Sequence, residues 1–277
     1  MKKTFVYLFA FFCLVSLFQS CKKDEATDPS TAAQAVAEDI VSHNDMTEQV
    51  EDEVYEAVPD NFTGDTDDRG GCAIVTYAQP KGTWPNTVTI DFGTGCTKPD
   101  GRTLKGKIIV KQSNKMSVTG ATRTVTFEGF FIENVQIEGS WTLTNTGLNP
   151  SAQPTFTRSG AETLNFPDGT TATHQINHIR TLVEGVSTPL VILDNVWSIL
   201  INDSGVNRKG ENYTVKSTNP LLKRAVCPWI GQGTLQFEHA GKTRTLDFGT
   251  GECDREATLT LADGTVKEVK IRHRWWK

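Results

Sequence analysis

Apolar and polar residues alternate with a period of two from Cys72 onward, and this pattern constrains the fold more than any other feature of the chain. Val88, Ile90 and Phe92 point to one face of a predicted strand, and the residues between them are polar. By the same test, about a dozen strand-like runs follow residue 70, with no strong helix among them. The pattern predicts an all-β core over residues 70–277, folded as an antiparallel β-sandwich or a long twisted meander.

Turn signals separate these runs. Asp-Gly pairs at 100–101, 168–169 and 263–264 each precede a strand-like run, as expected of tight hairpin turns. A core of this length fits one domain or two tandem halves, and the sequence leaves both open.

One long alternating run keeps its parity across a turn signal. Val125, Phe131 and Trp141 all occupy odd positions on the two sides of Glu133-Asn134. A two-residue hairpin turn would reverse that parity. The run therefore predicts either a loop with an odd number of residues or one bent strand.

A cysteine-containing motif occurs twice. The sequence Asp-Phe-Gly-Thr-Gly-Cys ends at Cys96, and Asp-Phe-Gly-Thr-Gly-Glu-Cys ends at Cys253. Each copy has a second cysteine a similar distance upstream, at Cys72 and Cys227. The two motifs, one near each end of the core, indicate a duplicated hairpin.

The midpoint of each cysteine pair falls in a turn-like segment, 82–86 for the first pair and 239–242 for the second. Each pair should therefore face across a hairpin. We predict the disulfides Cys72–Cys96 and Cys227–Cys253, formed in an oxidising compartment. A four-thiolate zinc site is the alternative, but such sites normally contain closely spaced cysteine pairs.

The N-terminus resembles a bacterial lipoprotein signal. A basic start precedes an apolar run from Phe5 to Phe18, shorter than the roughly 20 residues of a spanning helix. Leu17-Phe18-Gln19-Ser20 before Cys21 resembles a lipobox. The resemblance implies that residues 1–20 are removed and that Cys21 receives acyl chains such as palmitate, which anchor the protein to a membrane. The alternative is a plain secretory signal.

Lys22-Lys23-Asp24-Glu25 resembles the surface-export signal of Bacteroidota lipoproteins. It implies a lipid-anchored protein of the outer membrane that faces the cell exterior, and a periplasm-facing anchor is the alternative. Three segments, 99–110, 207–215 and 227–253, also resemble uncharacterised Bacteroidota lipoproteins. That resemblance implies an outer-membrane address and supplies no activity.

The segment between the anchor and the core is strongly acidic. Residues 22–69 contain 15 Asp and Glu against three Lys and Arg, whereas the core has an excess of basic residues. Val36, Ile40, Val50 and Val54 fall roughly at helical spacing, so 33–57 is predicted to form an amphipathic helix that ends before Pro59. We interpret 21–69 as a solvated spacer. A helix that docks its acidic face on the basic core is the alternative.

The sequence contains no common catalytic motif. G-x-S-x-G, H-E-x-x-H and P-loop patterns do not occur, and the Asp-Phe-Gly triplets lack the other kinase motifs. We therefore predict a non-enzymatic protein without a cofactor. A glycan hydrolase that uses Glu128, Glu133 or Glu138 is a weaker alternative, since on antiparallel strands these side chains should face solvent.

Two histidines lie four residues apart in a predicted strand. At about 3.3 Å per residue, His174 and His178 would be about 13 Å apart, too far to share one ion. The sequence therefore predicts no metal site.

The formal charge of −5 argues against a nucleic-acid partner. Trp84 lies in a predicted hairpin turn and is our candidate ligand contact, where it could stack on a sugar or on a partner protein. Packing over the base of the hairpin is the alternative. We predict a surface module that binds a glycan or an envelope or host protein, or serves as an envelope accessory. The runner-up is an adhesin or structural subunit that assembles through exposed strand edges.

Overall fold

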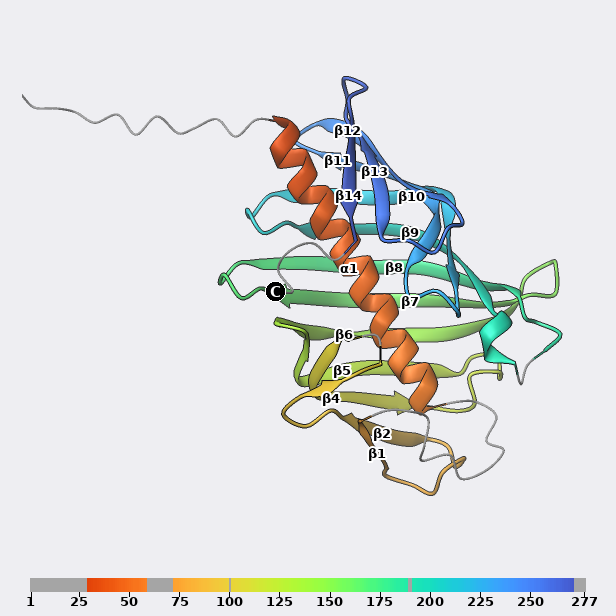
Figure 1. The fold of residues 1–277 in the computed structure, drawn as a ribbon. Coiled ribbons are helices and arrows are strands. Elements are labelled where there is room, and N and C mark those ends of the chain that lie inside the picture. Colours follow the sequence, from red (N-terminus) through yellow and green to blue (C-terminus); the bar gives the residue numbers. More distant parts are fainter. Residues whose placement is uncertain (1–28, 59–71, 100, 189–190, 272–277) are drawn as a thin grey trace, which may run out of the picture.

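The protein folds as one antiparallel sheet whose inner face is crossed by a single long helix (Figure 1). This computed structural model describes residues 29–58, 72–99, 101–188 and 191–271. Its elements in chain order are α1 (Pro29–Ala57), β1 (Ile74–Tyr77), β2 (Asn86–Asp91), β3 (Cys96–Thr97), β4 (Thr103–Gln112), β5 (Thr122–Ile132), β6 (Val135–Leu148), β7 (Pro154–Asn165), β8 (Thr171–Glu184), the 3₁₀ helix η1 (Ile192–Asp194), β9 (Val196–Val206), β10 (Asn212–Arg224), β11 (Ile230–His239), β12 (Lys242–Thr250), β13 (Glu256–Thr260) and β14 (Val266–Lys270).

The predicted all-β meander is confirmed. Each strand pairs with the next along the chain, except that β3 pairs only with β4, and β1 and β14 form the two ends of an open sheet. Two of the predicted Asp-Gly turns are present: residues 168–169 lie in the tight turn between β7 and β8, and residues 263–264 lie in the tight turn between β13 and β14. Asp100 of the third signal lies outside the described residues.

The parity prediction for 125–143 is wrong. The turn between β5 and β6 has the two residues Glu133 and Asn134, and Glu133 adopts a φ of 55°. A register irregularity between Thr126 and Phe130 shifts the alternation, so that Phe130 is buried and Phe131 points to the other face. The bulge and the two-residue turn each reverse the parity, and the two reversals cancel in the sequence pattern.

Both predicted disulfides are confirmed. The Cα atoms are 5.5 Å apart in Cys72–Cys96 and 5.7 Å apart in Cys227–Cys253. The second disulfide closes the β11–β12 hairpin, whose turn is Ala240-Gly241, at the midpoint between its cysteines. The first closes the β1–β2 hairpin, whose longer connection contains Trp84.

The predicted helix is confirmed, but its interpretation as a solvated spacer is wrong. α1 spans Pro29–Ala57, and every residue from 39 to 51 is buried. Buried acidic side chains on α1 pair with basic groups of the sheet, so charge complementarity adds to apolar contact. The alternative, an acidic helix docked on the basic core, describes the protein correctly.

Two apolar clusters flank the middle of the helix. The C-terminal core cluster joins the first half of α1, including Val36 and Ile40, to β9–β14. The N-terminal core cluster joins the second half, including Val50 and Val54, to β2–β8. All four side chains are fully buried, as their helical spacing predicted.

Within the described residues, the structure contains no helix with the length and apolarity that a membrane crossing requires. The predicted signal peptide 1–20, the lipidation site Cys21 and the export signal 22–25 lie outside the described residues.

Candidate functional site

A buried group of charged side chains, here called the polar centre, lies between the two apolar clusters. Arg158 on β7 is fully buried, and its Nη1 donates to Glu48 Oε1 of α1 at 2.8 Å. Arg158 Nη2 lies 3.2 Å from Glu51 Oε2, and Arg180 on β8 also donates to Glu48. Burial alone would raise the pKa of Glu48, but the charges and hydrogen bonds of Arg180 and Arg158 outweigh it and hold that pKa far below the usual range.

Glu162 on β7 and His43 on α1 continue the polar centre. Thr47 Oγ1 donates to Glu162 Oε2 at 2.7 Å, and His43 Nδ1 lies 3.9 Å from the same oxygen. Burial raises the pKa of Glu162 to about 7. Burial lowers the pKa of His43 well below its usual value, and the electrostatic effect of the nearby His174 lowers it further. His43 is therefore a neutral ring at pH 7.

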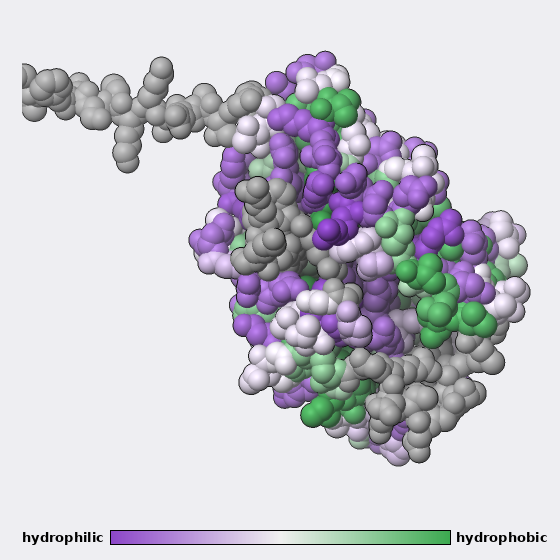
Figure 2. Space-filling model, viewed as in Figure 1, coloured by the Kyte–Doolittle hydropathy of each residue, from purple (hydrophilic) through white to green (hydrophobic). Residues whose placement is uncertain are grey.

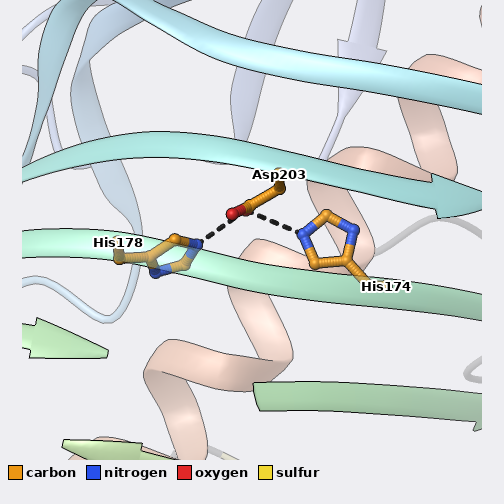
Figure 3. A group of neighbouring side chains, drawn as sticks. All are labelled: His174, His178 and Asp203. Carbon is orange, nitrogen blue, oxygen red and sulfur yellow. Dashed lines mark hydrogen bonds and ion pairs between the residues drawn. The ribbon is translucent and has the colours of Figure 1, made fainter. Parts of the chain in front are cut away.

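His174, His178 and Asp203 converge at the core of the polar centre (Figure 3). His174 Nε2 and His178 Nε2 lie 2.9 Å and 2.7 Å from the same oxygen, Asp203 Oδ2. The Asn177 backbone N–H donates to the other oxygen at 2.6 Å. Burial would raise the pKa of Asp203, but the electrostatic attraction of His178 and the hydrogen bonds of both histidines hold it far below the usual range.

The predicted separation of about 13 Å, too far for His174 and His178 to share one ion, does not describe their ring nitrogens, which contact the same carboxylate oxygen. It counted backbone positions along one strand, whereas the two rings lean toward the position between them. The β8–β9 register, with Gln175 opposite Ser204 and His178 opposite Ile201, places Asp203 at that position. The three ligand atoms lie within 4.8 Å of one another.

Several polar atoms of this region lack hydrogen-bond partners among the described residues. They include both ring nitrogens of His43, His178 Nδ1 and Glu162 Oε1. His43 instead stacks on His174, with ring centroids 4.6 Å apart and an angle of 18° between the planes. Buried polar atoms without partners are uncommon in folded proteins and call for a specific explanation.

A cleft of about 920 Å³ opens beside the second half of α1. Its apolar wall includes Phe156, Leu182 and Trp197, and its charged wall carries ion-paired groups of α1 and the sheet. On that charged wall, Lys223 Nζ donates to Asp52 Oδ2 at 3.0 Å, closing the side of the cleft next to the helix.

The rim of the cleft is apolar. Leu193 and Val226 are 68% and 64% exposed, and Val186 also lines the cleft. Figure 2 shows apolar side chains gathered over the segment that connects β8 to β9, where Val186 and Leu193 lie. An exposed apolar rim beside a concave, partly apolar cleft is typical of a binding site.

Trp84, the ligand contact expected from the sequence, does not line this cleft. Its side chain packs against the N-terminal core cluster and is partly buried. The packing alternative therefore describes Trp84.

The acidic residues and triplets singled out in the sequence form no shared site. Glu128 and Glu138 are exposed, and Glu133 Oε1 accepts from the Thr103 backbone N–H at 3.1 Å. Asp91 and Asp247 each accept a hydrogen bond from the glycine two residues later. The first triplet marks the end of β2, and the second lies inside β12, at its register irregularity with β11.

A scan of protein-family models found no match, and searches of curated proteins and of solved structures found none either. The fold and the site define a class nonetheless: an open β-meander with an internal helix and a cleft of ligand size. What such a protein does must be argued from the cleft and the polar centre themselves.

Proposed function

We propose that the protein is a non-catalytic, lipid-anchored binding module of the outer membrane, exposed to the cell exterior, and that its cleft holds a small amphipathic molecule. The cleft itself carries the proposal. Its volume of about 920 Å³ falls within the range of small-molecule sites, which is about 300–1,000 Å³. A lining that combines apolar and charged side chains suits a ligand with an apolar body and a polar end.

The chemistry of the walls favours an amphiphile over a glycan. Sugars stack on open aromatic faces, but Trp197 carries the Arg180 guanidinium 5.2 Å from its ring centroid. Phe156 meets Trp197 edge to face, at 5.7 Å and 65°. The two rings and Leu182 instead form a surface against which an alkyl chain can pack.

The charged wall suits recognition better than acid–base catalysis. Lys223 is paired with Asp52, and Arg123 Nη1 lies 3.5 Å from Glu51 Oε1. Groups held in ion pairs can orient the polar end of a ligand. An ion-paired wall of this kind supports a binding function rather than a hydrolase.

Assembly through strand edges, the adhesin alternative, has less support. β14 forms one end of the sheet and carries Lys267, Glu268 and Lys270. Charged side chains on an edge strand oppose pairing with another sheet. The proposal therefore expects a protein that stays monomeric as its concentration rises.

Palmitate is a suitable first ligand for calorimetric titration. We expect saturable binding of one molecule per chain, and Val226→Asp, at the rim, should weaken it about tenfold or more, since an ionised carboxylate disfavours an apolar contact. Val266→Asp on β14 is the matched control, because Val266 is 61% exposed, similar to Val226, and lies outside the cleft lining. Binding of cello-oligosaccharides without palmitate binding would favour a glycan ligand and contradict the proposal.

A further inference from the structure

We propose that His174, His178 and Asp203 form a zinc site inside the sheet, beneath α1 (Figure 3). Two imidazoles and one carboxylate are ligand types that Zn²⁺ takes in proteins. One ligand atom of each residue lies within 4.8 Å of the others, and all three residues are buried. The site is distinct from the cleft, and it does not depend on the function proposed above.

The three side chains are spaced as hydrogen-bond partners, slightly closer together than the ligands of a zinc ion. The two His Nε2 atoms lie 2.9 Å and 2.7 Å from Asp203 Oδ2. Tetrahedral ligands at about 2.0–2.1 Å from zinc are separated by about 3.3 Å. Each contact therefore has to widen by roughly 0.5 Å, which rotation of the side chains can supply.

Zinc binding conserves the protons of the two histidines. In these hydrogen bonds each Nε2–H donates to Asp203, so each ring holds its proton on Nε2. Zn²⁺ needs the Nε2 lone pairs, so each proton moves to Nδ1 of the same ring. His178 Nδ1 lacks a hydrogen-bond partner within the described structure, and His174 Nδ1 faces the Tyr213 hydroxyl at 2.8 Å.

A second layer of contacts already orients two of the ligands. The Tyr213 oxygen can accept from His174 Nδ1–H once that tautomer forms, and the Asn177 backbone N–H fixes Asp203 Oδ1 at 2.6 Å. Partners of this kind hold metal ligands in position and contribute strongly to affinity.

The surroundings of the cluster contain further unpaired polar atoms. Glu162 lies opposite His174 in the β7–β8 register, and its Oε1 has no hydrogen-bond partner among the described residues. A dication at the cluster would supply Glu162 with an opposite charge. His43 stacks nearly parallel to His174, so its lone pairs do not point at an ion bound in the plane of that ring. The remaining zinc position is therefore left for water.

The test uses the full chain without an affinity tag, stripped of metal and titrated with Zn²⁺ by calorimetry and with Co²⁺ by visible spectroscopy. We expect one ion per chain and the d–d absorption of tetrahedral Co²⁺. His178→Gln should weaken zinc affinity by about 100-fold or more, because it removes a ligand. His239→Gln is the matched control. His239 is also buried and pairs with a carboxylate, with Nε2 3.0 Å from Glu211 Oε2, but no third metal-binding side chain joins that pair among the described residues.

A readout on the unmodified protein keeps the test decisive if the His178 variant fails to fold. On Zn²⁺ addition, the Nε2 resonances of His174 and His178 should shift in ¹⁵N spectra of the wild-type protein, while those of His239 stay in place. Absence of zinc binding to the wild-type chain would overturn the proposal. Binding that shifts other histidines, or that survives unchanged in folded His178→Gln, would overturn it as well, and the cluster would then be a hydrogen-bonded part of the core only.

Discussion

Different interactions hold the two ends of α1 and its middle against the sheet: apolar contacts at the ends and buried ion pairs in the middle. Val36 and Ile40 in the first half and Val54 in the second are buried among apolar side chains of the sheet. In the middle, Glu48 meets Arg158 and Arg180 in a buried ionic contact. Apolar contacts supply most of the attraction but fix the helix only loosely along its axis. Buried charges add little net stability, yet a shifted helix would leave them unpaired, so the polar centre sets the position of α1.

Removing the basic partner in the polar centre should have the largest effect. Arg158→Met leaves Glu48 and Glu51 buried with fewer opposite charges, and we expect a loss of about 3–5 kcal/mol in the free energy of unfolding. Denaturant unfolding measures it. Lys270→Met is the control, because Lys270 pairs with Glu256 and Glu268 at the surface and its loss should leave the free energy of unfolding almost unchanged. Equal costs for the two variants would contradict a buried ionic contact at α1.

The disulfides sharpen the comparison between the two ends of the sheet. Their sequence separations are 24 and 26 residues, so the chain-entropy model predicts nearly equal contributions of about 3.5 kcal/mol each. Replacing both cysteines of one pair with serine should lower the free energy of unfolding by similar amounts at either end. A large difference would show that one hairpin is strained or that one end of the sheet unfolds separately.

An apolar truncation tests the first half of α1. Ile40→Ala should cost about 3 kcal/mol, because Ile40 is fully buried in the C-terminal core cluster. Ile179→Ala on β8 provides the control, since Ile179 is 45% exposed and its truncation should cost less than about 1 kcal/mol. If both truncations cost the same in thermal unfolding, the first half of α1 does not pack on the sheet as described.

The smallest expected effect is on how the free energy of unfolding changes at acidic pH when Glu48 is replaced. The folded state lowers the pKa of Glu48 below its usual value of 4.5, so the stabilising contribution of this carboxylate is present above pH 4.5 and is lost as the pH falls further. Glu48→Gln removes that titration. The decline in free energy of unfolding below pH 4.5 should then be shallower by at most about 1.4 kcal/mol per pH unit, the slope of one proton. An unchanged acid slope would mean that Glu48 titrates normally in the folded protein.

The strands, hairpins and disulfides could be predicted because they depend on local signals. Period-two alternation identifies strands, Asp-Gly pairs identify turns, and the symmetry of Cys227 and Cys253 about Ala240 identifies a closed hairpin. The bulge near Gly129 could not be predicted, because it cancels the parity change of the following turn. The cleft could not be predicted from the sequence either, because Leu193 and Val226 come together at its rim only in the folded sheet.

The polar centre was missed because charged residues are usually exposed. The acidic side chains of α1 have the composition of a solvated surface, and the two arginine partners of Glu48 are more than a hundred residues away. A signal was nevertheless present in β8, where His174, His178 and Arg180 share the parity of the buried Ile176. Charged and polar residues on the apolar face of a strand indicate that they have buried partners. Acidic residues of α1 can supply such partners for the basic side chains of the sheet.

Amide hydrogen exchange of the full chain tests most directly whether α1 is an internal part of the fold. We predict that amides from Ile40 to Val54 exchange as slowly as those in the central strands β7 and β8, because helix and sheet open together. Fast exchange across α1 with a protected sheet would contradict the account, since the helix would then be the solvated spacer that its acidic sequence suggests.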